Sequence, residues 1–378
     1  MRRLIEYSTH EVYKRSMSRY IWQCSDWPLF SFDSPSLLRE LSKVAYAQGK
    51  VASLSEQLGI QDCKELEAQI LADEIHYSHG IEGEVLEQFK IYSSLCRRLQ
   101  VPKASMKSSG PHIEGVVQTL LDALEHSQLP LTQERLFSWH RTLFPQGKSG
   151  PFSLHAGRYR TEPIEVLASS YKNQEVLYEA PPFEQVPQKM EEFLVWVNTP
   201  STLPNTVRSA IAHLWFLSIH PFEDGNGRMA RTIADYVLNQ QNTSNLVLFS
   251  LATQLKKHQK AYYDQLHEAQ TSSLDCTGWI LWYLTQLREA LEIVIETIEK
   301  TLKVNRLFQN LALNDRQSAM LVRLTTDFYG ALTTQKWARL SDCSHDTAMR
   351  DIKDLMKKGA LKQSEKGGRS TNYELVLE

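Results

Sequence analysis

Apolar residues recur every three to four positions along most of this chain, and that spacing predicts amphipathic helices rather than strands. Two apolar stripes flank a short polar stretch, one over Val207–Leu217 and the other over Met229–Leu238. The first helix is expected to end at His220. The second is expected to begin at the Gly225–Gly227 turn, where free backbone N–H groups and the positive end of its dipole would lie.

The same pattern places further elements on both sides of this pair. Amphipathic helices are predicted over Leu37–Leu58 and Val186–Asn198. Between them, apolar residues alternate over Ile164–Val166 and again over Val176–Tyr178, around a polar tip at 169–174. This alternation predicts a β-hairpin, and a plain surface loop is the alternative.

The last segment, from Asp315 onward, has the pattern of a compact winged helix. An apolar helix is followed by Thr333–Leu340, a short turn and a helix that Ser344 caps. The Gly-rich stretch Gly367–Leu375 is expected to form the wing. We therefore predict a mainly α chain, with a winged helix-turn-helix domain over 312–378.

Length and composition narrow the class of protein. The 378 residues allow two or three domains, which we place at 1–100, 110–305 and 312–378. With 42 Lys and Arg against 44 Asp and Glu, the net charge of -2 provides no overall attraction for nucleic acid or anionic membrane. No apolar run approaches the roughly 18 residues that cross a bilayer, so no membrane association is expected.

Cysteine and histidine usage adds little chemistry outside the polar stretch. The five cysteines are scattered and never spaced CxxC, which predicts reduced thiols and a cytoplasmic location, without a zinc site or a disulfide framework. The 12 histidines are dispersed as well. His76 and His79 form the one close pair, and we expect both on the surface of a helix.

The polar stretch at 220–231 carries the candidate chemistry. It reads His-Pro-Phe-Glu-Asp-Gly-Asn-Gly-Arg-Met-Ala-Arg. A helix N-terminus binds anions, phosphate above all, and Arg228 and Arg231 lie one turn apart where they can face the same anion. The alternative is a tight helix–helix turn with solvated charges. We assign Glu223 to solvent and expect Phe222 to be a packing anchor for His220.

This string resembles the signature of the Fic family, HxFx(D/E)GNGRxxR, at every specified position. Members of that family are protein adenylyltransferases, which move AMP from ATP onto a hydroxyl side chain. The resemblance implies a Fic-type helical core in which His220 is the general base and Asp224 holds Mg²⁺. It also implies that Gly225, Asn226 and Gly227 stabilise the phosphate oxygens, and that Arg228 and Arg231 hold the β- and γ-phosphates.

Other residues gain roles from the same resemblance. The adenine contacts would come from Tyr262, Tyr263 and Gln270, with core packing as the alternative for each tyrosine. The hairpin would be the flap that clamps a target segment by strand-like pairing. Its predicted target-binding residues are Glu165, Val166, Leu167 and Ala168.

A second short motif lies upstream, in a predicted helix near 70–84. Ser78-His-Gly-Ile-Glu82-Gly83 matches [S/T]xxxE[G/N], the inhibitory-helix signature of Fic proteins. By this resemblance, Glu82 would pair with Arg231 and occupy the space of the γ-phosphate. An ordinary capped surface helix is the alternative.

The expected function is therefore an autoinhibited protein adenylyltransferase that uses ATP and Mg²⁺ and modifies a Ser, Thr or Tyr hydroxyl of a target protein. One alternative is a Fic enzyme with another phosphate-containing donor. Another is a nucleotide-sensing DNA-binding regulator, although a purely binding role does not need the base His220. In that case the winged helix would meet DNA phosphates through a set of basic residues. These are Arg350, Lys353, Lys357, Lys366 and Arg369. A homodimer is left open.

Overall fold

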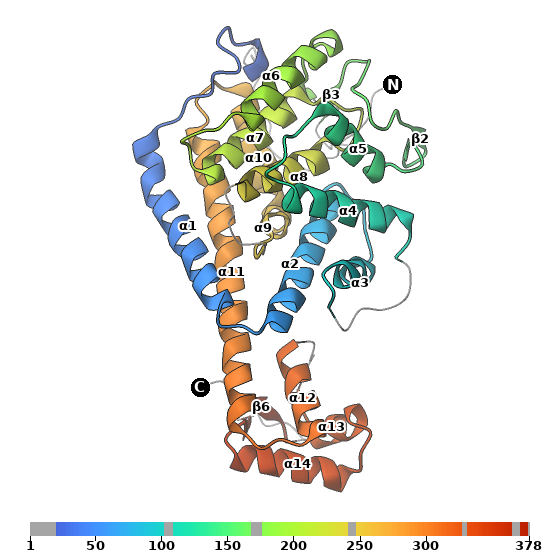
Figure 1. The fold of residues 1–378 in the computed structure, drawn as a ribbon, viewed down its shortest axis with the longest axis vertical. Helices are drawn as coiled ribbons and strands as arrows, with labels where there is room; N and C mark the ends of the chain where they lie inside the picture. The colour runs from blue at the N-terminus through green and yellow to red at the C-terminus, as the bar shows by residue number, and fades with distance from the viewer. Residues whose placement is uncertain are drawn as a thin grey trace. The chain divides into compact units, whose positions relative to one another are not determined.

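The computed structural model describes residues 20–101, 109–167, 176–240, 247–326, 331–364 and 371–376 (Figure 1). The chain divides into two compact units. The first contains the described residues up to Val51 together with Gly59–Glu292, and the second contains Ala52–Leu58 and the described residues from Ile293 onward. The first unit thus includes most of both the predicted N-terminal domain and the predicted core.

The first unit is helical, as predicted. Its helices in chain order are α1 (Ser34–Ser55), α2 (Ile60–Ile81), α3 (Gln88–Arg98), α4 (Pro111–Glu125), α5 (Gln133–Leu143), α6 (Val186–Asn198), α7 (Asn205–Ile219), α8 (Asn226–Asn239), α9 (Leu251–Lys257), α10 (Gln259–Thr271) and α11 (Thr277–Asn310). The last residues of α1 and of α11 belong to the second unit. Two short 3₁₀ helices, Ile21–Gln23 and Phe183–Gln185, complete the helical elements described there.

Helices α7 and α8 form the centre of the unit and hold the polar stretch between them (Figure 1). The sequence pattern predicted that α7 has one polar face exposed to solvent. In the structure every residue of α7 is buried. The reason is that α6, α8 and α10 all pack against it. Its one arginine, Arg208, donates from Nη2 to the backbone carbonyls of Trp196, Val197 and Thr199.

Two antiparallel hairpins flank the core. The predicted hairpin is present as β3 (Glu165–Leu167) paired with β4 (Val176–Glu179), and Ala168 lies outside the described residues. A shorter hairpin of β1 (Lys148–Ser149) and β2 (Phe152–Ser153) was not predicted. Each of its strands has two residues, too few to show an alternating pattern.

Helix α2 packs against α3, α4, α8 and α9, and this packing overturns one expectation. His79 was expected on a helix surface, but it is buried, with 3 % of its surface exposed. His76, the other histidine of this close pair, is half-buried and forms a hydrogen bond from Nδ1 to the carbonyl oxygen of Leu86.

The second unit contains α12 (Asp315–Thr326), α13 (Thr334–Leu340), α14 (His345–Lys357), β5 (Leu361–Gln363) and β6 (Tyr373–Leu375). Strands β5 and β6 pair antiparallel, and Leu332 forms a further antiparallel bridge to Tyr373. The Ser344 hydroxyl caps α14 by accepting from the Thr347 amide, as predicted. The elements follow the predicted order of helices and hairpin around a core that includes Trp337, Ile352 and Leu355.

The five cysteines are all free thiols. Within the described residues, no helix combines the length and apolar character needed to span a bilayer.

Candidate functional site

The loop between α7 and α8 has the shape that the sequence predicted. Helix α7 ends at Ile219, and His220 follows in the left-handed conformation with φ 51°. Gly225, with φ 78°, turns the chain into α8. A side chain at Gly225 would also collide, because a β-carbon there would lie 2.8 Å from the ring of Phe144. The turn therefore requires glycine for both backbone and space.

Asn226 closes the loop on itself. Its side-chain Oδ1 accepts from the Phe222 amide at 2.9 Å, and its Nδ2 donates to the Phe222 carbonyl at 2.8 Å. The amide predicted to meet phosphate is thus engaged in the loop and buried. Phe222 is fully buried, as expected for a packing anchor, and stacks on His140 with ring centroids 4.1 Å apart.

His220 is held in one tautomer. Its Nδ1 lies 3.2 Å from the Leu217 carbonyl oxygen, which can only accept, so Nδ1 carries the proton and Nε2 keeps its lone pair. Burial lowers the pKa of His220 to about 4, with the charge of Arg160 acting in the same direction. The ring is therefore neutral at pH 7 and able to take a proton.

Two residues that we did not single out from the sequence position this loop. Arg160 donates from Nε to the His220 carbonyl oxygen at 2.8 Å. His140 donates from Nε2 to the Asp224 carbonyl oxygen at 3.0 Å, and its Nδ1 accepts from the Gly157 amide. Both lie far from the loop in sequence and belong to no recognised spacing.

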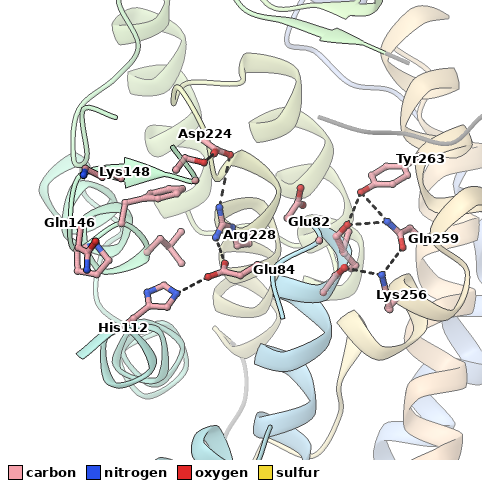
Figure 2. Close-up of a pocket in the computed structure, with 18 residues that line it drawn as sticks. Glu82, Glu84, His112, Gln146, Lys148, Asp224, Arg228, Lys256, Gln259 and Tyr263 are labelled. Atoms are coloured by element: carbon pink, nitrogen blue, oxygen red, sulfur yellow. Dashed lines mark hydrogen bonds and ion pairs between the residues drawn. The ribbon is translucent and has the colours of Figure 1, made fainter. Parts of the chain in front are cut away.

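The loop borders a cavity of about 860 Å³ (Figure 2). Its lining includes the end of α2, the segment around β1, the end of α9 and the starts of α4, α8 and α10. Its acidic, basic and histidine side chains are Glu82, Glu84, His112, Lys148, Asp224, Arg228 and Lys256. His220 and Arg231 are buried and are not among the lining residues.

Glu82 lies between Arg231 and this cavity. Nη2 of Arg231 is 3.0 Å from Oε1 of Glu82, so the predicted ion pair is present. Ser78 completes the contact, because its hydroxyl and its carbonyl each accept from Arg231 at 2.8 Å. Burial alone would lower the pKa of Arg231, but the charge of Glu82 raises it.

Glu82 also covers the first turn of α8. A β-carbon added at Gly227 would overlap Oε1 of Glu82, which places the carboxylate directly against the helix N-terminus. That position is the one where a helix binds a phosphate. Gly83, the last residue of the motif at 78–83, follows in the left-handed conformation with φ 79°.

Arg228 has a carboxylate partner that we did not predict. Its Nη1 lies 2.6 Å from Oε2 of Glu84, and Oε1 of Glu84 lies 2.8 Å from Nε2 of His112 (Figure 2). Burial would raise the pKa of Glu84, but the His112 hydrogen bond and the charge of Arg228 lower it to about 2. Each motif arginine therefore faces a carboxylate.

Of the three residues predicted to contact adenine, one lines the cavity and two do not. Tyr263 lines the cavity, and its hydroxyl donates to the Ile81 carbonyl at 3.3 Å. Tyr262 is 1 % exposed and forms a hydrogen bond with Nε2 of His213 in the core. Gln270 is buried as well and lies 3.5 Å from the Ser218 hydroxyl. Neither Tyr262 nor Gln270 lines the cavity.

The end of α2 is tied to α9 and α10 by contacts that carry no motif. Lys256 donates to the Gly80 carbonyl at 2.8 Å, and Gln259 donates to the Ile81 carbonyl at 2.9 Å. These bonds hold the segment from which Glu82 reaches Arg231. Glu223 also differs from expectation, because its carboxylate accepts from the amide and the ring of His155 rather than from solvent alone.

Asp224 suits a hard metal ion. Its carboxylate lines the cavity, where Oδ2 accepts from the Ser149 hydroxyl and Oδ1 lies 3.9 Å from Arg228. Carboxylate oxygens at a water-accessible wall are the ligands that Mg²⁺ prefers. The residues present thus fit the expected ion.

The predicted flap residues Glu165, Val166 and Leu167 form β3, and Tyr178 of β4 donates from its hydroxyl to the Ser218 carbonyl at 2.6 Å. This bond attaches the hairpin to the end of α7, close to His220.

In the second unit, Arg350, Lys353 and Lys357 are exposed on α14, whereas Lys366 and Arg369 lie outside the described residues. An exposed basic helix face suits an acidic protein surface as well as DNA, so it does not distinguish DNA binding from protein binding.

Comparison with known proteins agrees with this geometry. A family model described as "Fic/DOC family" matches residues 130–238, and one described as "Domain of unknown function (DUF4172)" matches residues 20–101. "Protein adenylyltransferase fic-1" of Caenorhabditis elegans is 25% identical over 207 residues, covering 53% of this chain and 37% of that protein. "Protein adenylyltransferase Fic" of Culex quinquefasciatus is 23% identical over 249 residues, covering 62% of this chain and 46% of that protein. The chain thus spans less than half the length of these relatives.

Solved structures share the fold. A Fic family protein from Desulfovibrio desulfuricans superimposes with a TM-score of 0.56 at 20% identity, covering 92% of this chain and 98% of that one. A Fic domain containing signaling protein from Bacteroides thetaiotaomicron gives a TM-score of 0.54 at 23% identity, covering 69% of this chain and 97% of that one.

Proposed function

Because residues 130–238 are a domain of the Fic/DOC family, we propose that this chain is a protein adenylyltransferase that moves AMP from ATP onto a hydroxyl side chain of a target protein. The observation that carries the proposal is the unprotonated Nε2 of His220 next to the N-terminus of α8. A general base and an anion-binding helix end are the two elements that transfer of a phosphate group to a hydroxyl requires.

The proposed reaction transfers AMP to the target hydroxyl and releases pyrophosphate. The target hydroxyl oxygen attacks the α-phosphorus of ATP, and its proton passes to Nε2 of His220. The bond from the α-phosphorus to the bridging oxygen breaks, and pyrophosphate leaves. Arg228 and the α8 N-terminus would neutralise the phosphate charge, and Mg²⁺ held by Asp224 would offset the charge of the phosphates.

We further infer that the described conformation is inhibited by Glu82. Its carboxylate pairs with Arg231 and lies against Gly227, where a γ-phosphate would need to bind. Two negative groups cannot share that position without a large Coulomb penalty. ATP would therefore bind poorly or in a geometry that does not align its α-phosphate with His220.

The donor can be tested with labelled ATP. In a Glu82→Gly background, protein incubated with ATP labelled at the α-phosphate should become labelled, and protein incubated with γ-labelled ATP should not. Adding His220→Ala should remove the transferred label while ATP binding, measured by equilibrium dialysis, is retained. His155→Ala is a matched control, because that exposed imidazole contacts Glu223 of the same loop but has no role in the reaction.

Transfer of the γ-label would replace the proposal with phosphorylation. Unchanged α-label transfer in the His220→Ala protein would show that His220 is not the base. ATP binding with no label in any variant would favour the nucleotide-sensing alternative.

A further inference from the structure

Three potential metal ligands meet beside the cavity, and none of them has a catalytic role in the proposed reaction. His79 comes from α2, Glu84 from the segment after it and His112 from the first turn of α4. One ligand atom from each lies within 4.8 Å of the other two. Figure 2 shows the imidazole of His112 directed at the carboxylate of Glu84.

The imidazole of His79 is the informative member. Its Nδ1 lies 3.0 Å from the carbonyl oxygen of Ile75, which can only accept, so Nδ1 carries the proton and Nε2 carries a lone pair. That Nε2 is buried, has no hydrogen-bond partner and lies 3.9 Å from Oε2 of Glu84. A buried lone pair without a partner is unfavourable, and a metal ion is a group that would satisfy it.

The backbone contact of His79 is also the one that metal-binding histidines make. Such histidines usually donate their second ring N–H to a carbonyl or carboxylate, which fixes the ring and leaves the other nitrogen free for the ion. At His112, Nε2 lies 2.8 Å from Oε1 of Glu84. A proton now links these two atoms, and a metal ion could take its place.

We propose that His79, Glu84 and His112 bind a divalent transition-metal ion of the Zn²⁺ type. Two imidazoles and one carboxylate suit Zn²⁺, Co²⁺ or Ni²⁺, whereas Mg²⁺ and Ca²⁺ favour oxygen ligands alone. This site differs from the oxygen-ligand position at Asp224. It also revises the expectation of no zinc site, which rested on the spacing of the cysteines and not on the histidines.

The remaining coordination positions would open into the cavity, because Glu84 and His112 both line it. Glu84 is the only carboxylate in the cluster, and its Oε2 also pairs with Arg228. The ion and Arg228 would therefore share one negative charge. Loss of that charge should weaken metal binding more than loss of either imidazole.

Co²⁺ binding to the full chain tests the site. We expect one Co²⁺ per chain, detected by its visible absorption bands, and displacement of Co²⁺ by Zn²⁺ but not by Mg²⁺. His112→Ala, at a half-buried side chain, should weaken Co²⁺ binding at least tenfold, and Glu84→Gln should weaken it more. Circular dichroism of each variant establishes that the fold is retained.

His126→Ala is the matched control. His126 lies 3.0 Å from Asp122, which also pairs with an arginine, Arg135, so this group copies the histidine–carboxylate–arginine arrangement without a second histidine. His126→Ala should leave Co²⁺ binding unchanged. Asp224→Ala should also retain it, which separates this site from the proposed Mg²⁺ position and from the transferase activity. Failure of the wild-type chain to bind Co²⁺, or equal binding by the His112→Ala protein, would overturn the proposal.

Discussion

The two arginines of α8 each face a carboxylate, but they lie in different surroundings. The side chain of Arg231 is 2% exposed and that of Glu82 is 19% exposed, and Ser78 supplies two further hydrogen bonds. The side chain of Arg228 is 8% exposed and that of Glu84 is 33% exposed. Both carboxylates line the cavity, but the contact of Arg231 with Glu82 is the less exposed of the two.

This difference indicates how strongly each contact can hold the site closed. A charge-assisted contact away from water is stronger than one at the surface, where solvent screens the charges. Arg231 with Glu82 and Ser78, here called the Arg231 region, is thus expected to be the main block to productive ATP binding. Arg228 with Glu84, called the Arg228 region, is expected to be a weaker block. Glu84 is further divided between Arg228 and His112, so it is less committed to the arginine.

The largest effect is expected for Glu82→Gly. Removing a charge-assisted contact worth about 1.5–3 kcal/mol should raise the rate of AMP transfer about 10- to 100-fold at saturating ATP and Mg²⁺. Adding Arg231→Ala should abolish this gain, because the arginine released by Glu82 is the group that would bind the γ-phosphate. The rate is measured as incorporation of α-label, including self-modification.

Glu87→Ala is the control for Glu82→Gly. Glu87 pairs with Lys90 on the surface, so its loss removes a nearby carboxylate without touching either arginine of α8. A wild-type rate is expected for it. Should Glu82→Gly leave the rate unchanged or lower it, the end of α2 is an ordinary packed helix and the block lies elsewhere.

A smaller effect is expected for Glu84→Ala. An ion pair whose carboxylate is partly exposed to solvent contributes about 0.2–1 kcal/mol, so the rate in the Glu82→Gly background should rise at most about fivefold. Salt should reduce the difference further, because the screening length falls to about 3 Å at 1 M. A gain as large as that of Glu82→Gly, persisting in high salt, would show that the two regions are equivalent and that the comparison is wrong.

Sequence reasoning located what depends on local spacing. The end of α7 at His220 and the turn at Gly225 follow from a short motif whose geometry is set within a few residues. The pairing of Glu82 with Arg231 joins residues 149 apart, and it was expected only from the resemblance to the Fic family. The pairing of Arg228 with Glu84 joins residues 144 apart in the chain. No motif marks that carboxylate, so only the packing of α2 beside α8 reveals it.

A second limit of sequence reasoning is that it does not show which side of a helix other helices cover. Successive residues on a helix point about 100° apart, so Tyr262 and Tyr263 cannot face the same side of α10. The sequence offers both to a ligand, but Tyr262 packs against Trp282 in the core and Tyr263 lines the cavity. His79 is misassigned for the same reason, because which side of α2 is covered depends on helices distant in the sequence.

The last effect, on stability and not on the rate of transfer, concerns proton uptake in the Arg231 region. Burial and the charge of Arg231 lower the pKa of His213 to about 3, and this ring packs against Tyr262, Trp279 and Tyr283. In the unfolded chain the imidazole takes up a proton below about pH 6.5, whereas the folded one stays neutral down to about pH 3. Wild type should therefore lose about 1.4 kcal/mol of unfolding free energy per pH unit in this window through His213.

His213→Gln lacks that loss, so the pH dependence separates it from wild type. At pH 7 the variant should melt below wild type, because a buried ring and its hydrogen bond to Tyr262 are gone. As the pH falls from 7 to 5, the gap between the two melting temperatures should narrow by a few degrees. His126→Gln, at a half-exposed ring, controls for the loss of a histidine as such. A gap that stays constant or widens would mean that the folded chain protonates His213, and that the Arg231 region is open to water like the Arg228 region.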